Sequence, residues 1–210
     1  MRLNGLKSWM MLVGVVVLIC GCGNQTKERR PFAEAEGFTC PDGARRVEIR
    51  DTSYPEFYCV GEKGRTGTWL EFDVNGRLRK RGEYKDGKLN GPWLAYHVDG
   101  TVETSGQMEN DARVGVWTQN YVNGVRRSEK SYRNNQLDGP VKLYYNTGEL
   151  MAEGGHIAGI EEGSWKVYTP EGKLARECTL VHGEEKDCIV HDKEFMKSTY
   201  QYESKERGPL

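Results

Sequence analysis

The sequence Gly82-Glu-Tyr-Lys-Asp-Gly-Lys-Leu-Asn-Gly-Pro-Trp-Leu-Ala-Tyr-His-Val-Asp-Gly100 decides the fold of this chain, because variants of it recur every 24 residues. One glycine holds the same place in five consecutive copies: Gly67, Gly91, Gly115, Gly139 and Gly163. Two places later stand Trp69, Trp93, Trp117, Val141 and Trp165. A second glycine series keeps the same period: Gly76, Gly100, Gly124, Gly148 and Gly172. A constant period of this length indicates a repeat architecture, so we expect five copies of one unit over residues 66–186.

Each unit is predicted to contain two strands and two turns. The short run Trp93–Tyr96 reaches the turn residues Val98-Asp99-Gly100, and the following strand ends at a second turn of the Asp86-Gly87 kind. Both are hairpin sequences. The second turn recurs as residue types that tolerate positive φ: Gly87, Asp111, Asn135, Gly159 and Gly183. The fold class is therefore all-β, an elongated antiparallel meander of about five 24-residue, two-strand repeats.

Two different segments flank the array. Residues 39–65, with the alternating run Arg46–Arg50 and the apolar run Phe57–Val60, are interpreted as a degenerate N-terminal capping repeat that covers the first sheet edge. Residues 187–210 are expected to add a last strand at Cys188-Ile-Val and then a polar tail.

Composition limits the partners. Thirty basic side chains against 31 acidic ones give a formal charge of -1, whereas nucleic-acid-binding modules usually carry a strong basic excess. We therefore expect no nucleic-acid partner. A hydrophobic content of 37% with 26 glycines suits a thin, turn-rich β protein rather than one with a deep core.

The N-terminus indicates export. The apolar run Trp9–Cys20 is too short to cross about 30 Å of hydrocarbon as a helix and fits the core of a signal peptide. Its end, Ile19-Cys20-Gly21-Cys22, resembles a bacterial lipobox, which implies cleavage after residue 21 and acyl chains, palmitate among them, on Cys22. The alternatives are an uncleaved anchor or an ordinary cleaved signal.

These assignments predict a lipid-anchored protein of the bacterial cell envelope. Gly23, rather than Asp, follows the lipidated cysteine, which favours the outer over the inner membrane. Residues 22–38 are polar and are expected to form a flexible tether between the acyl chains and the folded part.

After cleavage and lipidation, four cysteines remain in the exported chain: Cys40, Cys59, Cys178 and Cys188. The compartment is expected to be oxidising, so these cysteines are expected to form disulfides. Four cysteines allow three pairings. We favour Cys40–Cys59 and Cys178–Cys188, because each pair brackets one end of the array. A zinc site of Cys178, His182, Cys188 and His191 is the alternative at the C-terminal end, with loosely fitting ligand spacing. We expect neither a metal nor a cofactor.

The unit from Gly82 to Gly100 resembles the MORN-type repeat, in the bacterial variant found in proteins labelled as YwqK-type antitoxins. The resemblance covers about 120 of 210 residues. The chain departs from the pattern at Val141 in the Trp slot, at Asn120 in the first-strand aromatic slot, and at three places in the second: Met108, His156 and Leu180. The resemblance implies a protein-interaction or scaffold role, with lipid binding claimed for eukaryotic relatives, and no catalytic activity.

The recurring aromatic residues admit two interpretations. They can stack on one another between adjacent repeats and so bury apolar area, or they can form a solvent-facing stripe that binds a protein or glycan. The candidates for such a stripe are Trp69, Trp93, Trp117, Trp165, Phe72, Tyr96, Tyr144 and Tyr168. No catalytic motif is present, and the acidic pairs Glu161-Glu162 and Glu184-Glu185 fall at predicted turns. The predicted function is thus an envelope protein-binding or scaffold module; the alternatives are a toxin-neutralising protein and a glycan-acting enzyme.

Overall fold

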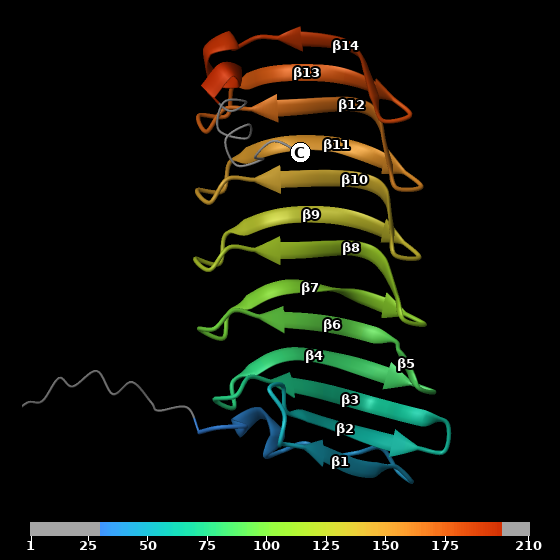
Figure 1. Cartoon of the computed structure of the whole chain (residues 1–210). Helices are drawn as coiled ribbons and strands as arrows, with labels where there is room; N and C mark the ends of the chain where they lie inside the picture. Colours follow the sequence, from blue (N-terminus) through green and yellow to red (C-terminus); the bar gives the residue numbers. More distant parts are fainter. Residues whose placement is uncertain (1–29, 199–210) are drawn as a thin grey trace, which may run out of the picture.

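The computed structural model describes residues 30–198, which form one open sheet (Figure 1). The sheet has 14 strands that follow one another in chain order, every neighbouring pair antiparallel. The short strand β5 pairs only with β4. The prediction of an elongated all-β meander is therefore confirmed. The signal peptide, Cys22 and the end of the polar tail lie outside the described residues.

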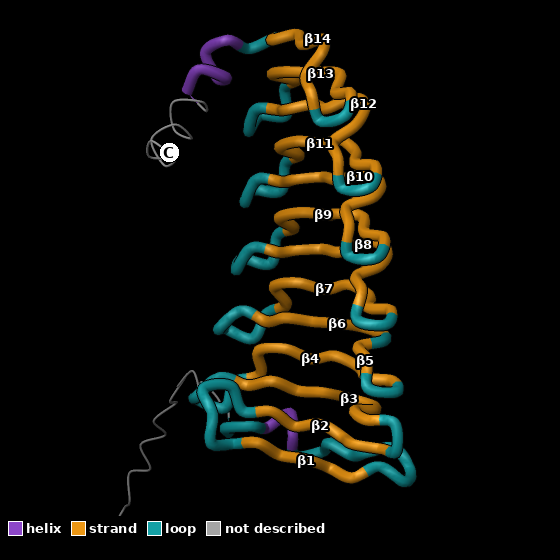
Figure 2. The backbone as a smooth tube through the Cα atoms, turned by 45° about the vertical axis from the view of Figure 1, so that its right-hand side comes forward, coloured by secondary structure: helices purple, strands orange, loops and turns teal. Residues whose placement is uncertain are grey.

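The strands are β1 (Arg45–Ile49), β2 (Glu56–Gly61), β3 (Gly64–Phe72), β4 (Leu78–Lys85), β5 (Lys88–Leu89), β6 (Gly91–Tyr96), β7 (Val102–Glu109), β8 (Ala112–Asn120), β9 (Arg126–Arg133), β10 (Gln136–Tyr144), β11 (Leu150–Ile157), β12 (Ile160–Tyr168), β13 (Leu174–Val181) and β14 (Glu184–Val190). Figure 2 shows them stacked in one row, with the 3₁₀ turn η1 (Ala33–Ala35) beside the first strands.

Along one side of the sheet, two-residue turns join the strands. In the β11–β12 hairpin, Ile157 pairs with Ile160, and both intervening residues have positive φ: 50° at Ala158 and 85° at Gly159. Positive φ at both central residues is what a type I′ turn requires, and its twist matches that of the strands. Asp86-Gly87, Asn110-Asp111, Asn134-Asn135 and His182-Gly183 repeat this pattern.

Along the other side, the loops are longer, and from the β3–β4 loop onward each contains one glycine of the second series. In the loop after β6, the amide of Gly100 donates to the carbonyl of His97, and that of His97 donates to Thr101. Gly100 itself has a φ of 88°. The same pair of hydrogen bonds recurs one repeat later at Tyr121 and Gly124. The predicted hairpin positions of these glycines are confirmed.

The first glycine series has a role that the sequence does not reveal. All five have positive φ, for example 66° at Gly115 and 79° at Gly163. Gly91 begins β6, and the other four lie inside long strands. At Gly163 the register changes: Gly155 pairs with Glu162, but Glu153 pairs with Lys166. Two extra residues are therefore accommodated in β12 as a bulge, and glycine permits the left-handed backbone there.

A cluster of buried residues forms a small core at the N-terminal end of the sheet. Phe57, Phe72 and Leu70 pack with Ala35 and Phe38 of the segment that precedes β1. Residues 31–38 belong to the expected tether, yet the amide of Phe32 donates to the carbonyl of Gly76, and Ala35 and Phe38 are buried. This part of the tether is thus packed rather than flexible, because its apolar side chains cover the open face of the first strands.

The two disulfides lie at opposite ends of the sheet. Cys40 is bonded to Cys59, with Cα atoms 5.6 Å apart, and Cys178 is bonded to Cys188, with Cα atoms 4.1 Å apart. These are the pairs predicted from the sequence. The last strand also forms as expected, and residues 193–198 after it are helical (Figure 1).

Candidate binding surface

The eight predicted aromatic residues do not form one surface. Side chains alternate between the two faces of a strand, and Trp69 and Leu70 of β3 therefore point to opposite faces. The Trp face carries Trp69, Trp93, Trp117 and Trp165. The Tyr face carries Phe72, which packs with Leu70 in the core, and Tyr96, Tyr144 and Tyr168 in the same slot of later repeats.

On the Trp face, a tryptophan packs on the glycine that precedes it by eleven residues. A β-carbon at Gly106 would overlap the indole of Trp117, and one at Gly154 would overlap that of Trp165. At Gly82 the contact is looser, with Cδ1 of Trp93 3.5 Å from such a β-carbon. Because glycine has no side chain, the indole ring of the next repeat can lie directly on the backbone at this position, which we call the indole seat.

One glycine–tryptophan pair, shared by two consecutive units, is replaced at both positions. Lys130 stands where three of the other units have Gly82, Gly106 and Gly154, and eleven residues later Val141 replaces tryptophan. Val141 is itself buried, at 4% exposure. Because Lys130 has a side chain, no flat seat exists for an indole at position 141, and a smaller side chain is accommodated instead. The loss of the ring at Val141 therefore has a local structural cause.

The aromatic residues also contact one another. The rings of Trp93 and Trp117 have centroids 5.4 Å apart, and Tyr132 meets Trp117 edge-on at 6.3 Å. Trp69 and Trp117 are each only 7% exposed. Their indole Nε1 atoms, like that of Trp165, are buried without a hydrogen-bond partner. Within the described residues these rings serve mainly to pack the sheet, the first of the two interpretations.

A groove of about 420 Å³ lies on the Trp face across β6–β9 and the turn after β9. It includes Lys130 of the replaced pair, and its lining residues are Trp93, Thr104, Met108, Arg113, Trp117, Gln119, Ser128, Lys130, Tyr132 and Asn135. Among these residues, only Trp93 and Trp117 belong to the aromatic stripe that the sequence predicts. Lys130 could have been found from the sequence, since it interrupts a regular glycine series.

The groove is positively charged. The guanidinium of Arg113 lies over the ring of Tyr132, 4.3 Å from its centroid, and 5.8 Å from the centroid of Trp117. None of the described residues that line the groove carries a carboxylate. Neither Arg113 nor Lys130 takes part in an ion pair within residues 30–198. The groove therefore combines an aromatic floor with two cations that no acidic side chain neutralises.

The Tyr face is arranged differently. Phe72 is completely buried and so does not belong to a solvent-facing stripe. The hydroxyl of Tyr144 donates to Glu129, and that of Tyr168 donates to Glu153 at 2.9 Å. Burial, and then the neighbouring carboxylate, raises the pKa of both tyrosines above the usual value. These tyrosines connect adjacent strands as hydrogen-bonded pairs.

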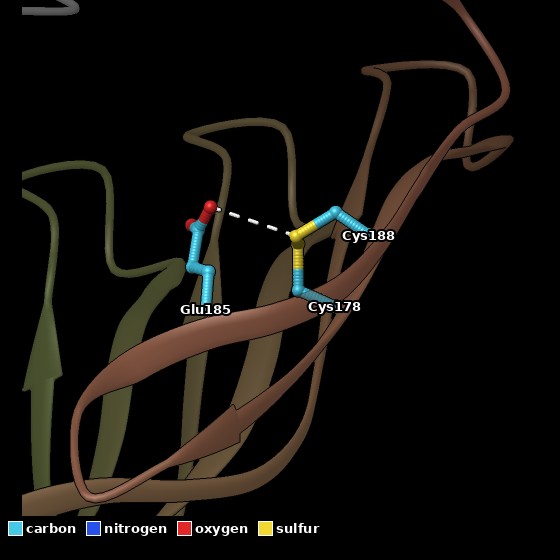
Figure 3. A group of neighbouring side chains, drawn as sticks. All are labelled: Cys178, Glu185 and Cys188. Carbon is cyan, nitrogen blue, oxygen red and sulfur yellow. Dashed lines mark hydrogen bonds between the residues drawn. A yellow bond between two sulfur atoms is a disulfide. The ribbon is translucent and has the colours of Figure 1, made fainter.

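The C-terminal cysteines form a disulfide rather than a zinc site. Figure 3 shows Cys178 and Cys188 bonded, with the carboxylate of Glu185 beside them. Oε2 of Glu185 lies 3.5 Å from Sγ of Cys188. These three residues could ligate a metal only after reduction. Of the predicted zinc ligands, His191 instead meets Glu177, 3.1 Å from Nε2, and the side chain of His182 is largely exposed.

No helix within residues 30–198 has the length and apolar character needed to cross a membrane. No curated protein matches the chain. Solved structures give weak matches: accessory secretory proteins 1, 2 and 3 of Streptococcus pneumoniae (9% identity, TM-score 0.34, covering 55% of this chain and 21% of that one), a GtfA/B complex bound to UDP and GlcNAc (12%, 0.24, 83% and 32%), and the Gap123 glycosylation-associated complex of Streptococcus agalactiae (10%, 0.23, 86% and 28%). The chain spans a third or less of each of those chains, and these scores do not establish a shared fold.

A family model gives the informative match. Residues 137–156 and 161–186 match the MORN repeat variant. These segments correspond to β10–β11 and β12–β14, and the same 24-residue spacing extends from them back to β3. Repeats of this type suggest a membrane-associated or protein-binding scaffold module. The chain therefore contains MORN-type repeats.

Proposed function

We propose that this chain is a protein-binding module of the bacterial cell envelope, held at the membrane by acyl chains on Cys22, and that its partner docks on the Trp face. The observation that supports this is the groove across β6–β9, where aromatic side chains and two cations are gathered. Trp, Tyr, Met and Arg are the residue types enriched at protein interfaces.

The single-layer architecture supports the same proposal. An elongated sheet offers one flat, rigid surface on which side chains keep fixed positions, because inter-repeat hydrogen bonds hold the turns in register. The amide of Asn135, for instance, donates to the carbonyl of Arg113 in the preceding hairpin, and the amide of Gly159 donates to Leu137. A rigid surface loses little conformational entropy when a partner docks.

Photo-crosslinking from the full-length, acylated protein in its native membrane tests the docking face. Benzoylphenylalanine replaces Thr104, which lines the groove, or Val116, which is exposed on the Tyr face. We expect one partner, identified by mass spectrometry, to crosslink from position 104 and not from position 116. Absence of any specific product at position 104, or the same products from both positions, would contradict the proposal.

Anchorage is tested separately. Cys22→Ser should abolish incorporation of radiolabelled palmitate and leave a larger, unprocessed precursor. Continued labelling of that variant would exclude Cys22 as the lipidated residue and leave the docking result unaffected.

A further inference from the structure

We propose that the groove on the Trp face binds an acidic peptide segment of the partner, with a carboxylate paired to Lys130 and Arg113 and a neighbouring apolar side chain placed on the aromatic floor. This inference rests on the proposed binding function and names the chemistry of the partner.

The groove arises where one repeat departs from the others. Three units have glycine in the slot occupied by Lys130, and the tryptophans that follow are Trp93, Trp117 and Trp165. Eleven residues after Lys130, at the start of the next unit, the tryptophan is replaced by Val141. The replacement removes a large ring from the face and introduces a cation at the same place. A change that only stabilised the sheet would keep the indole seat, because the seat buries apolar area.

The two cations lack the partners that other cations on this face have. Lys80 pairs with Glu71 at 2.9 Å near one end of the array, and Arg176 pairs with Glu185 near the other. Between them, Lys130 and Arg113 face aromatic rings and polar groups, with no carboxylate in the groove lining among the described residues. Half-buried cations without an opposite charge are best satisfied by an anion from outside, since charge-assisted hydrogen bonds are the strongest of their kind.

The shape of the groove favours a peptide over a membrane or a sugar. Lys130 is half-buried in the groove, and the guanidinium of Arg113 lies over the ring of Tyr132. Binding to a flat bilayer would require cations that project from the protein surface, and neither of these does. Neutral sugars present hydroxyl groups that need acceptors as well as donors, but the amide oxygens of Gln119 and Asn135 already accept from Ser128 and from the amide of Arg113. A neutral sugar would also leave the two cations without an opposite charge. An extended acidic peptide can lie across the strands, place one carboxylate between the cations and seat an apolar side chain on Trp93, Met108 and Trp117.

Fluorescence anisotropy with full-length, acylated protein in detergent micelles tests the proposal. The probe is a fluorescein-labelled peptide of alternating Glu and Phe, and its control carries Gln in place of every Glu. We expect saturable binding of the Glu peptide below about 1 mM, weakened by added salt, and at least tenfold weaker binding of the Gln peptide. Failure of the wild-type protein to bind the Glu peptide would overturn the inference.

Two groove variants and one control locate the site. Lys130→Gly/Val141→Trp restores the pattern of the other repeats and is designed to fold, and Arg113→Gln removes the second cation. Each should weaken binding of the Glu peptide at least tenfold. Lys142→Gln, an exposed position on the Tyr face, should leave the affinity for the Glu peptide unchanged.

Equal affinity of all three variants for the Glu peptide would overturn the inference. It would also be overturned if the protein did not bind the peptide but bound phosphatidylglycerol vesicles or polygalacturonate in a way that depends on Lys130. If crosslinking from Thr104 succeeds while the peptide fails, the binding function stands and only the acidic-peptide inference falls.

Discussion

Trp117 lies on the backbone of Gly106, so close that no β-carbon fits between the indole and the strand. The two residues are eleven positions apart and belong to consecutive repeats, so each contact of this kind joins one unit to the next. The segment before β1 packs on the first strands at the N-terminal end, and in the middle of the array these contacts take the place of a conventional core. The same relationship joins Trp165 to Gly154.

The first prediction tests this contact. Gly106→Ala should lower the free energy of unfolding by about 1–3 kcal/mol, because the added methyl group forces the indole of Trp117 from its seat. Gly106 does not have positive φ, so alanine is not strained there by the backbone, and any loss of stability reports on the packing of Trp117. The measurement is urea unfolding followed by tryptophan fluorescence. Gly37→Ala is the control, since a β-carbon there meets nothing within 4 Å. Equal stability of the two variants would contradict the packing described.

The second prediction uses the repeat that lost its indole. Val141→Trp alone should destabilise by about 1–3 kcal/mol, since Lys130 occupies the seat. Lys130→Gly alone should cost about 0.5–1 kcal/mol, as glycine does within a strand. Combined, the two changes restore the pair seen at Gly106 and Trp117, and their effects should be coupled favourably by about 0.5–3 kcal/mol. Chemical denaturation of the four proteins gives this coupling energy, and simple additivity would show that the two positions are independent.

The third prediction concerns a strained turn. Ala158 has a φ of 50°, whereas the matching positions of other hairpins hold Asn110 and Asn134, a residue type that tolerates this conformation better. Ala158→Asn should therefore stabilise the protein by about 0.5–1 kcal/mol. Asn134→Ala is the reciprocal control and should destabilise by a similar amount. Thermal unfolding measures both, and shifts of the same sign would argue against the turn type.

The fourth prediction is a pH dependence. Burial, followed by the hydrogen bond to Glu153, raises the folded-state pKa of Tyr168, so the folded protein holds this proton at pH values where the unfolded chain has released it. The resulting stabilisation is complete below about pH 10, the usual pKa of tyrosine, and is lost as pH rises through the higher folded-state value. Urea unfolding of the wild type and of Tyr168→Phe from neutral pH to about pH 11 should show a smaller loss in the variant. Parallel curves would mean that Tyr168 does not titrate differently in the two states.

Much of the architecture is readable in the sequence because it is local. Asp86-Gly87 and Asp99-Gly100 specify hairpin turns through their own backbone preferences, and the 24-residue period dictates that each hairpin stacks beside the next. The cysteine pairs Cys40–Cys59 and Cys178–Cys188 follow from this linear layout, because the two ends of the meander are far apart (Figure 1).

Other features could not be read in this way. The packing of residues 31–38 on the first strands depends on Ala35 and Phe38, which are too few apolar residues in a polar stretch to predict a folded segment. The positive φ of Gly115 inside a strand also gives no local signal, because the bulge appears only when β7 and β8 are aligned.

By itself, then, the sequence determined the repeat unit, its hairpins and the all-β meander, since all three follow from short-range backbone preferences and from period. Only the tertiary structure decided which face each aromatic series occupies, that Trp117 rests on Gly106, and that Lys130 and Arg113 meet in one groove. These relationships depend on strand register across the bulges, which brings together residues that are distant in the chain, and a register is a property of two strands rather than of either one alone.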